Sequence, residues 1–411
     1  MPAQISELHS NSQVNLINMK LLLSAYACFP NHGSEPGVGY LWLSKSLEAG
    51  YSVTLLTSGW SYDRLRSDPL VDHHLLDILV TGSSFGDGLW RRRRILYQLY
   101  LIVWQLVAAL TLLIRGLRFD IAHHVTYGGV TIPSFIGFFA KKSIYGPVGG
   151  GEAAPLALAR ACGRGALVKE ILKRGQQSLV FLDPFVWLTK IGFSEILIKN
   201  KSNLWVFWGF QKKCRVKAEI AVNTQMFEHL SFSEKGESKK IAFSGRGIYW
   251  KGGMLAVKFA EKFQEKYPNA NVEFHFFGDG REFKEWEARA SKGKVQRVFF
   301  HGRLSQDEYI RQFSLMDLLW FPSFHDSSGN VVLESLVLGV PVVAFDLAGP
   351  SSIIDHDDFL IDPNLQFSDM AEKFISKSNS LLMMSGSRRR EISTYYLSKF
   401  SSKMLLNGVY Q

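Results

Sequence analysis

The order strand, loop, helix, strand recurs along this chain, and this repetition constrains its fold more than any other feature. In the first half, apolar runs at 20–24 and 52–57 flank a glycine-rich loop and a helical stretch at 40–49. In the second half, apolar runs fall at 240–244, 272–277, 298–301, 318–321 and 341–345, with helical stretches at 252–267, 281–290, 305–314 and 331–338 between them. Strands that alternate with helices form parallel sheets covered on both faces. We therefore expect an α/β protein with two Rossmann-like, doubly wound domains facing across a cleft.

The domain boundaries follow from a change in composition. A chain of 411 residues is too long for one ordinary core. We expect further strands of the first domain at 77–80, 120–125 and 143–145, and its last strand at 218–222. The polar run at 231–240 has no apolar period and is the expected linker. The predicted parts are a disordered extension at 1–18, a first domain at 19–230, a second domain at 241–385, and a helix at 386–411 that returns toward the first domain.

The charge balance favours anionic partners. The formal net charge is +10, with a pI of about 9.3, which suits nucleotides, acidic lipid headgroups or nucleic acid. The clustered basic and aromatic pattern of nucleic-acid modules is absent, so we expect no nucleic-acid partner. Three widely spaced cysteines make a disulfide framework or zinc site unexpected and fit the cytoplasm. Residues 1–18 lack the apolar run of a secretory signal.

A long uncharged segment raises the question of a membrane. Residues 95–114 carry no charge, but tyrosine, glutamine and threonine interrupt the apolar run. The block Arg91 to Arg94 precedes the segment, and Arg115 and Arg118 follow it. We expect a helix that is buried or lies on an acidic membrane surface, with a transmembrane helix as the alternative.

The strongest site pattern lies between 321 and 354. Ligands of open α/β sheets bind beyond the carboxyl ends of the strands. Gly329 allows a tight turn into a helix, whose first N–H groups, at Asn330 and Val331, suit a diphosphate. Glu334, one turn into that helix, is placed to accept hydrogen bonds from a ribose, and Asp326 from a donor sugar. The alternative is an ordinary strand–helix unit with a solvent-facing glutamate.

Arg246 and Lys251 form a second pattern. Both lie in a glycine-bearing loop between a strand and a helix. Two such cations can neutralise a pyrophosphate leaving group. The alternative is a surface loop with unrelated cations.

The first half contributes two further loops. Gly33 and Gly37 follow the first strand, where glycines let the backbone approach a phosphate or sugar. His123 and His124 end a later strand, where histidines orient a hydroxyl or relay a proton. The alternative is one packed and one solvated histidine. No third ligand at a metal-site spacing accompanies them, so we expect no metal.

In this order, these motifs resemble a family. The second half resembles the retaining glycosyltransferases of the GT-B type, in group 1 or family 4. The resemblance rests on G-R-x-x-x-x-K-G at 245–252, G-D-G at 278–280, V-F-F-H-G at 298–302, P-S at 322–323, and the carboxylate block that ends G-V-P-V-V at 339–343. The first half is similar to one subgroup through its motifs at 27–37, 123–126 and 146–152.

The resemblance implies a function and site roles. It implies transfer of a sugar from a nucleotide-sugar donor to a glycan or lipid-linked acceptor, with retention of configuration and without a metal or other cofactor. It implies that Arg246 and Lys251 hold the donor diphosphate, that Glu334 binds ribose, and that Asp326 faces the sugar. It further implies that the loop of Gly33 and Gly37 approaches the phosphates, and that His123 or His124 lies near the reacting carbon. A bacterial surface polysaccharide or glycolipid is the expected product.

Two departures leave alternatives open. The family's usual block is E-x7-E, whereas this chain has Asp326 at the first position, one methylene shorter. The adjacent pair His123 and His124 replaces the His-x-His of many relatives, so either histidine could be nearest the chemistry. A nucleotide-sugar epimerase or hydrolase of the same fold, or a catalytically inactive scaffold, remains an alternative.

Overall fold

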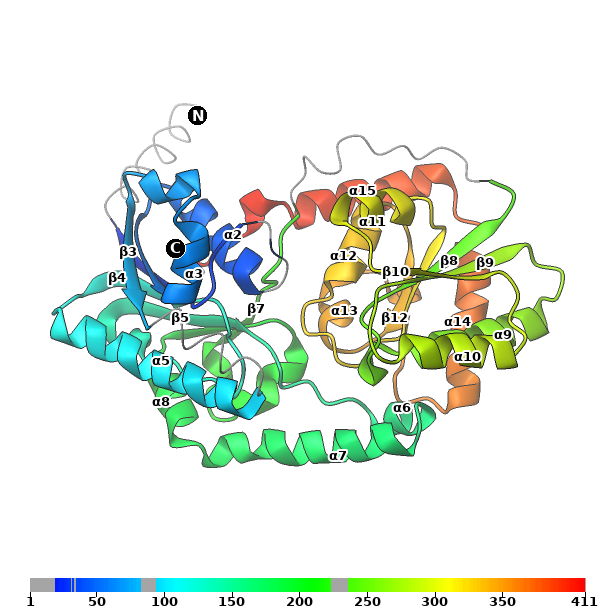
Figure 1. The fold of residues 1–411 in the computed structure, drawn as a ribbon, viewed down its shortest axis with the longest axis horizontal. Coiled ribbons are helices and arrows are strands. Elements are labelled where there is room, and N and C mark those ends of the chain that lie inside the picture. Colours follow the sequence, from blue (N-terminus) through cyan, green and yellow to red (C-terminus); the bar gives the residue numbers. More distant parts are fainter. Residues whose placement is uncertain (1–18, 31, 33–34, 83–93, 223–235, 411) are drawn as a thin grey trace, which may run out of the picture. The chain divides into compact units, whose positions relative to one another are not determined.

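The protein consists of two compact units. The computed structural model describes residues 19–30, 32, 35–82, 94–222 and 236–410 (Figure 1). The first unit comprises Met1–Gly151, Gln177–Glu219 and Lys403–Gln411, and the second comprises Glu152–Gln176 and Ile220–Ser402. The division differs from the sequence-based one in two places, because 152–176 belongs to the second unit and the second unit already begins at Ile220. Residues 403–411 fall in the first unit, whereas the rest of the expected terminal segment falls in the second.

The first unit is built on a parallel sheet of seven strands, in the order β3-β2-β1-β4-β5-β6-β7. The strands are β1 (Lys20–Ser24), β2 (Ser52–Ser58), β3 (Leu76–Thr81), β4 (Phe119–His124), β5 (Ala140–Val148), β6 (Glu195–Ile198) and β7 (Cys214–Val216). The α-helices are α2 (Glu35–Glu48), α3 (Gly59–Leu65), α5 (Arg94–Ile114) and α8 (Pro184–Gly192). The strand order reverses between β1 and β4, as in a doubly wound Rossmann sheet.

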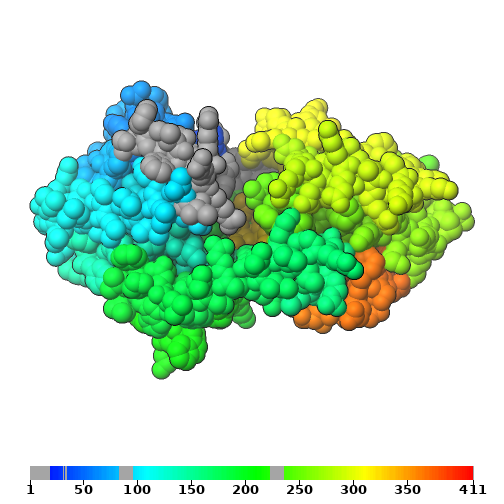
Figure 2. Space-filling view, turned by 60° about the horizontal axis from the view of Figure 1, so that its bottom comes forward, coloured from blue at the N-terminus to red at the C-terminus, as the bar shows by residue number. Residues whose placement is uncertain are grey.

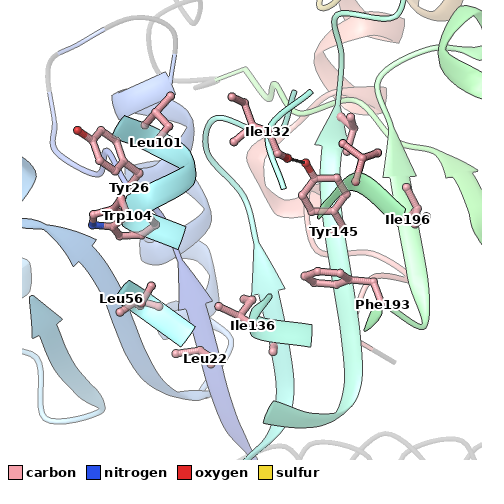
Figure 3. Packing of buried hydrophobic residues seen from close by; sticks show 14 of the residues in the cluster. Leu22, Tyr26, Leu56, Leu101, Trp104, Ile132, Ile136, Tyr145, Phe193 and Ile196 are labelled. Carbon is pink, nitrogen blue, oxygen red and sulfur yellow. Dashed lines mark hydrogen bonds between the residues drawn. The ribbon is translucent and has the colours of Figure 1, made fainter. Parts of the chain in front are cut away.

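The core of this unit forms where α5 packs on the sheet (Figure 3). Leu101, Trp104, Ala108 and Leu112 recur every three or four residues along α5 and are buried. The Trp104 indole donates a hydrogen bond to the carbonyl oxygen of Thr81 at 2.9 Å. Burial of one helix face fixes α5 against β3 and leaves its other face exposed.

The second unit repeats the design with six parallel strands, in the order β10-β9-β8-β11-β12-β13. The strands are β8 (Lys239–Ser244), β9 (Val272–Phe277), β10 (Val298–Gly302), β11 (Leu318–Phe321), β12 (Val342–Phe345) and β13 (Leu360–Ile361). The α-helices are α6 (Leu156–Ala161), α7 (Arg164–Ser178), α9 (Gly253–Lys266), α10 (Phe283–Lys292), α11 (Gln306–Phe313), α12 (Asn330–Val337), α13 (Ala348–Ile353), α14 (Phe367–Leu381) and α15 (Gly386–Lys399). Of these, α7 ends in the first unit.

Three expected elements differ from the structure. No strand forms at 218–222, and the first sheet instead ends with β6 and β7, which come from a stretch without clear periodicity. Helix α2 begins at Glu35, five residues before the predicted start, so the glycine-rich loop is shorter than expected. The terminal helix ends at Lys399, and residues 400–410 contain an isolated β-bridge at Ser401, a short 3-10 helix and turns.

Candidate functional site

The candidate donor site lies at the carboxyl edge of the second sheet, where the strand order reverses. The loop after β8 carries Arg246 and Lys251, and the loop after β11 carries Asp326. The strands β8 and β11 are parallel neighbours, but the chain continues from β8 toward one edge of the sheet and from β11 toward the other edge. The loops that follow these two strands therefore diverge and leave a crevice. The fold therefore brings together two loops that are far apart in the sequence.

Two glycines shape these loops. Gly252 has φ +76°, and a Cβ there would collide with the carbonyl oxygen of Pro322. Gly329 has φ +67°, and a Cβ there would lie 2.7 Å from Cδ1 of Ile353. Both positions favour glycine because side-chain-bearing residues rarely adopt a left-handed conformation. Gly329 is the N-cap of α12, and the first-turn N–H groups of Asn330 and Val331 have no acceptor within the helix.

An ion pair joins the two loops. The ammonium group of Lys251 donates a hydrogen bond to Oδ2 of Asp326, and both side chains are largely buried. The other oxygen, Oδ1, accepts from the backbone N–H of Gly329 at 2.8 Å. Lys251, Asp326 and the start of α12 therefore form one continuous polar cluster.

A hollow of about 340 Å³ lies beside this cluster. Arg246, Arg303 and Tyr309 line it, together with the glycines at the ends of β8, β9 and β10. Tyr309 donates a hydrogen bond to the Ser244 hydroxyl at 3.1 Å. The hollow is also lined by Asp279, so two guanidinium groups and one carboxylate give it a net positive lining that can accept a flat, anionic ligand.

Glu334 lies near this hollow. Burial raises the pKa of the Glu334 carboxyl to about 7. Burial raises the pKa of Tyr309 well above its usual value, and the charge of Glu334 raises it further. Glu334 is therefore a partly desolvated group whose charge changes near neutral pH, as is common at binding sites.

The structure buries both predicted histidines inside the first unit. His123 donates from Nε2 to the carbonyl oxygen of Gly146 at 2.7 Å, and its Nδ1 is hydrogen-bonded to the Tyr410 hydroxyl at 2.9 Å. His124 lies within hydrogen-bonding distance of Ser24 and Gln105. Burial lowers the pKa of both histidines to about 3. Both rings are therefore neutral at pH 7, and a catalytic role stays a prediction.

The first glycine-rich segment is only partly described. Gly37 lies in the first turns of α2 rather than in a loop, while Gly33 lies outside the described residues. A carboxylate oxygen of Glu35 accepts from the backbone N–H of Tyr127 at 2.5 Å, at the carboxyl edge of the first sheet. Tyr127 has φ +55°, which is rare for a bulky residue.

Sequence reasoning missed several of these groups. Arg303 follows β10 directly, so the rule that ligands bind at carboxyl ends could have identified it. Tyr309 lies inside α11, and no local pattern distinguishes it. Among the described residues, no group of three or more histidine, cysteine, aspartate or glutamate side chains is arranged to hold a metal ion.

Comparison with solved structures identifies the fold. HepE of Anabaena in complex with UDP and glucose aligns with a TM-score of 0.54 and 14% identity, over 95% of this chain and 98% of HepE. A mutant of TarM from S. aureus, in complex with fondaparinux, alpha-GlcNAc-glycerol and UDP, aligns with a TM-score of 0.57 and 12% identity, over 95% of this chain and 98% of TarM. With its two doubly wound parallel sheets, the chain has the GT-B fold.

The sequence comparisons name the family. Residues 226–391 match the family described as Glycosyl transferases group 1. An uncharacterised glycosyltransferase of Methanocaldococcus jannaschii is 28% identical over 143 residues, which cover 34% of this chain and 36% of that protein. A 2-deoxystreptamine N-acetyl-D-glucosaminyltransferase of Niallia circulans is 24% identical over 257 residues, which cover 58% of this chain and 62% of that protein. The region 226–391 of this chain is therefore similar to the group 1 glycosyltransferases.

The matched regions are partial. The alignments cover between 26% and 62% of the length of the curated relatives. One of these relatives is a D-inositol 3-phosphate glycosyltransferase of Paenarthrobacter aurescens, which is 29% identical over 33% of this chain and 35% of that protein.

Proposed function

We propose that the protein is a retaining glycosyltransferase that moves a sugar from a nucleotide-sugar donor to a glycan or lipid-linked acceptor. The main support is the polar cluster of Lys251, Asp326 and the α12 start, next to the hollow that Arg246 lines. Cations and free helix N–H groups stabilise a diphosphate at the moment it leaves. The group 1 match over 226–391 supports the same activity.

Each group in the cluster has a proposed role. Arg246 and Lys251 bind the diphosphate, together with the N–H groups of Asn330 and Val331. Glu334 accepts hydrogen bonds from the ribose, and Asp326 accepts them from the donor sugar. The bond between the anomeric carbon and the diphosphate oxygen breaks, its electron pair leaves with the diphosphate, and the acceptor hydroxyl oxygen bonds to the same carbon. The acceptor proton then leaves with the diphosphate or with solvent.

The reaction is proposed to need no metal. In many nucleotide-sugar enzymes a divalent cation balances the leaving diphosphate, and here Lys251 and Arg246 supply positive charge at that place. Burial lowers the pKa of both His123 and His124, so both rings are neutral. We therefore propose that one of them supports the transfer reaction through its position, and not through a positive charge.

The acceptor is proposed to be polyhydroxylated, in bacterial surface polysaccharide or glycolipid synthesis. The names of the relatives include transferases to 2-deoxystreptamine and to D-inositol 3-phosphate, both ring polyols. The structural neighbours include a lipopolysaccharide outer core galactosyltransferase, WaaB. These names support a hydroxyl-rich acceptor.

We further propose that the protein works in the cytoplasm at the inner surface of an acidic membrane. The segment Leu96–Ile114 of α5 is long and apolar enough to cross a bilayer. Only 28% of it is buried within the protein, so most of this apolar helix is accessible (Figure 2, cyan). Among its described side chains, every exposed one is apolar: Leu99, Val103, Leu106, Val107, Leu110, Leu113 and Ile114.

The surroundings of α5 support the same surface. Phe138 and the α8 side chains Phe185, Leu188 and Ile191 are also exposed, and the 3-10 helix Ile136–Phe139 contacts both α5 and α8. Exposed Arg115 and Arg118 follow the helix, while Arg91 to Arg93 precede it outside the described residues. An apolar face with basic ends suits an anionic bilayer surface.

A nucleotide-release experiment tests the activity. The purified protein is incubated with UDP-, GDP- and ADP-sugars, with and without a membrane extract as acceptor. Release that requires the extract, together with a labelled product, supports transfer. Release without acceptor would favour the epimerase or hydrolase, and failure to bind any of these nucleotides would contradict the proposal.

A further inference from the structure

Three hydrogen-bonded side chains, two of them buried, lead to the residue before Asp326. Lys173 donates a hydrogen bond to Nδ1 of His325 at 2.9 Å, and Nε2 of His325 donates to Oε2 of Glu170 at 2.6 Å. The Glu170 side chain is completely buried, and His325 is 7% exposed. Since Nδ1 accepts from an ammonium group, the ring carries its proton on Nε2.

The carboxylate end of this chain is well satisfied. Oε1 of Glu170 accepts from the backbone N–H of Ala154 at 3.1 Å. Burial disfavours a charge on Glu170, but the hydrogen bonds from His325 and Ala154 together with nearby positive charge, including that of Lys173, more than compensate, so the pKa of that carboxyl is lowered. A buried carboxylate with such partners is a firm attachment point.

This chain of contacts ties α7 to the site loop. Glu170 and Lys173 lie on α7, in a segment that precedes the second sheet by some sixty residues but belongs to the second unit. His325 immediately precedes Asp326. Consecutive Cα atoms are about 3.8 Å apart, so a fixed His325 restricts where the Asp326 carboxylate can lie.

The other attachments of Asp326 lie on the ligand side. Its carboxylate contacts Lys251, which is proposed to bind the diphosphate, and the N–H of Gly329, which directly precedes the proposed N–H groups of Asn330 and Val331. A bound diphosphate competes for these two donors. The bond from Gly349 N–H to the Asp326 carbonyl oxygen, at 2.7 Å, and the His325 contacts do not depend on them.

We propose that Glu170 and Lys173 act through His325 as positioning residues, which hold Asp326 against the donor sugar while Lys251 binds the diphosphate. The proposal rests on the proposed function. It assigns part of the donor-sugar geometry to a helix that precedes the matched group 1 region. Positioning of this kind affects the sugar portion of the donor and not its nucleotide portion.

Calorimetry on the full-length protein tests this assignment. A thermal-shift panel of UDP-glucose, UDP-galactose, UDP-N-acetylglucosamine and GDP-mannose selects the nucleotide sugar that binds best. The dissociation constants of that nucleotide sugar and of its matching nucleoside diphosphate are then compared. Their ratio isolates the contribution of the sugar. The variants are His325→Leu, which removes both hydrogen bonds of the ring, and Lys173→Met, which removes one of them together with the bond from Lys173 to the carbonyl oxygen of Glu152.

His325→Gln is the conservative variant, because its amide can accept from Lys173 and donate to Glu170. Lys266→Met is the matched control, since it removes an exposed ion pair with Glu372 in the same unit. We expect His325→Leu to reduce the contribution of the sugar about tenfold with little change in nucleoside diphosphate binding. We expect His325→Gln to restore most of it and Lys266→Met to leave it unchanged. In an Asp326→Asn background, His325→Leu should add nothing.

The outcomes are distinguishable. An equal loss of affinity for the nucleotide sugar and the nucleoside diphosphate in His325→Leu would indicate general structural damage and overturn the positioning role. An unchanged ratio would overturn it too, while leaving the proposed function intact. If the wild-type protein bound none of the four nucleotide sugars, the proposed function itself would fail, and this inference with it.

Discussion

Lys251 forms a hydrogen-bonded ion pair with Asp326, although 75 residues separate them in the sequence. Lys251 follows β8 and Asp326 follows β11, so the pair spans the point at which the strand order of the second sheet reverses. Only 14% and 12% of their side chains are exposed. Removal of either partner leaves the other charge poorly solvated, so a ligand group of opposite charge can take the place of the lost partner.

Substitutions in this pair should separate nucleotide binding from sugar transfer. In Asp326→Asn, Lys251 loses its carboxylate partner and is free to bind a diphosphate, so we expect UDP binding to be kept or strengthened while transfer is lost. In Lys251→Met, we expect UDP binding to weaken by about tenfold to a hundredfold, because a charge-assisted bond is lost. Calorimetry with UDP measures both. Equal weakening in the two variants would contradict the assigned roles.

The buried Glu334 should make the protein less stable at alkaline pH. Its folded-state pKa of about 7 lies above the ordinary value, so the folded state binds more protons than the unfolded state between about pH 4.5 and 7. Stability should therefore fall as pH rises through this range, by about 3 kcal/mol at most. We expect Glu334→Gln to melt at a higher temperature than wild type at pH 8, with the difference lost at pH 4.5. A pH-independent difference would mean that Glu334 is not desolvated.

Glu334 should also make donor binding depend on pH, and donor binding should strengthen as pH rises, whereas stability falls. Since the ionised carboxylate is the better acceptor for ribose hydroxyls, we expect the KM for the donor to rise as pH falls below 7, while Glu334→Gln should show a weak, pH-independent affinity. A donor KM that stays constant from pH 6 to 8 in the wild-type protein would argue against ribose binding by Glu334.

The two buried histidines should make the first unit sensitive to acid. Burial lowers the pKa of His123 and His124 to about 3, whereas an unfolded histidine binds a proton near pH 6.5. Stability is thus fully present above pH 6.5 and is lost toward pH 3, by about 1.4 kcal/mol for each histidine at pH 5.5. We expect His124→Gln to reduce this acid sensitivity in thermal unfolding. His74→Gln, which removes an exposed histidine, is the control and should not.

The exposed face of α5 should bind anionic vesicles. We expect the protein to float with vesicles that contain phosphatidylglycerol at low salt, and less with pure phosphatidylcholine, because basic residues flank the apolar face. The double variant Leu106→Glu, Leu110→Glu should abolish flotation, whereas Leu315→Glu, at an exposed apolar position of the second unit, should not. Binding that survives the double variant would place the membrane contact elsewhere.

Much of the second sheet was predictable from the sequence. The short segments that end at 244, 277 and 321 are apolar and buried on both faces of the sheet. Their continuous apolar sequence and their length were therefore enough to predict the strands β8, β9 and β11. The strands β6 and β7 were missed because they are short and lie among irregular aromatic and basic residues. At Glu35, the helix starts with Glu-Pro-Gly, and a proline with two nearby glycines indicates a loop even though proline is well tolerated in a first turn.

The site was predictable only where it follows the strands. Arg246, Lys251 and Asp326 lie in loops after strands, where the rule for parallel sheets applies. Glu170 and Lys173 lie on a helix that no such rule connects with the site. Their proximity to His325 depends on long-range packing, which local patterns do not encode.

The placement of 152–176 in the second unit has a consequence for how the protein can be divided. A recombinant fragment that began at 236, just before β8, would include all six strands of the second sheet, but it would leave His325 without Glu170 and Lys173. The two halves of this sequence are therefore not independent, and a chimera with a group 1 glycosyltransferase should carry α7 along with the second sheet.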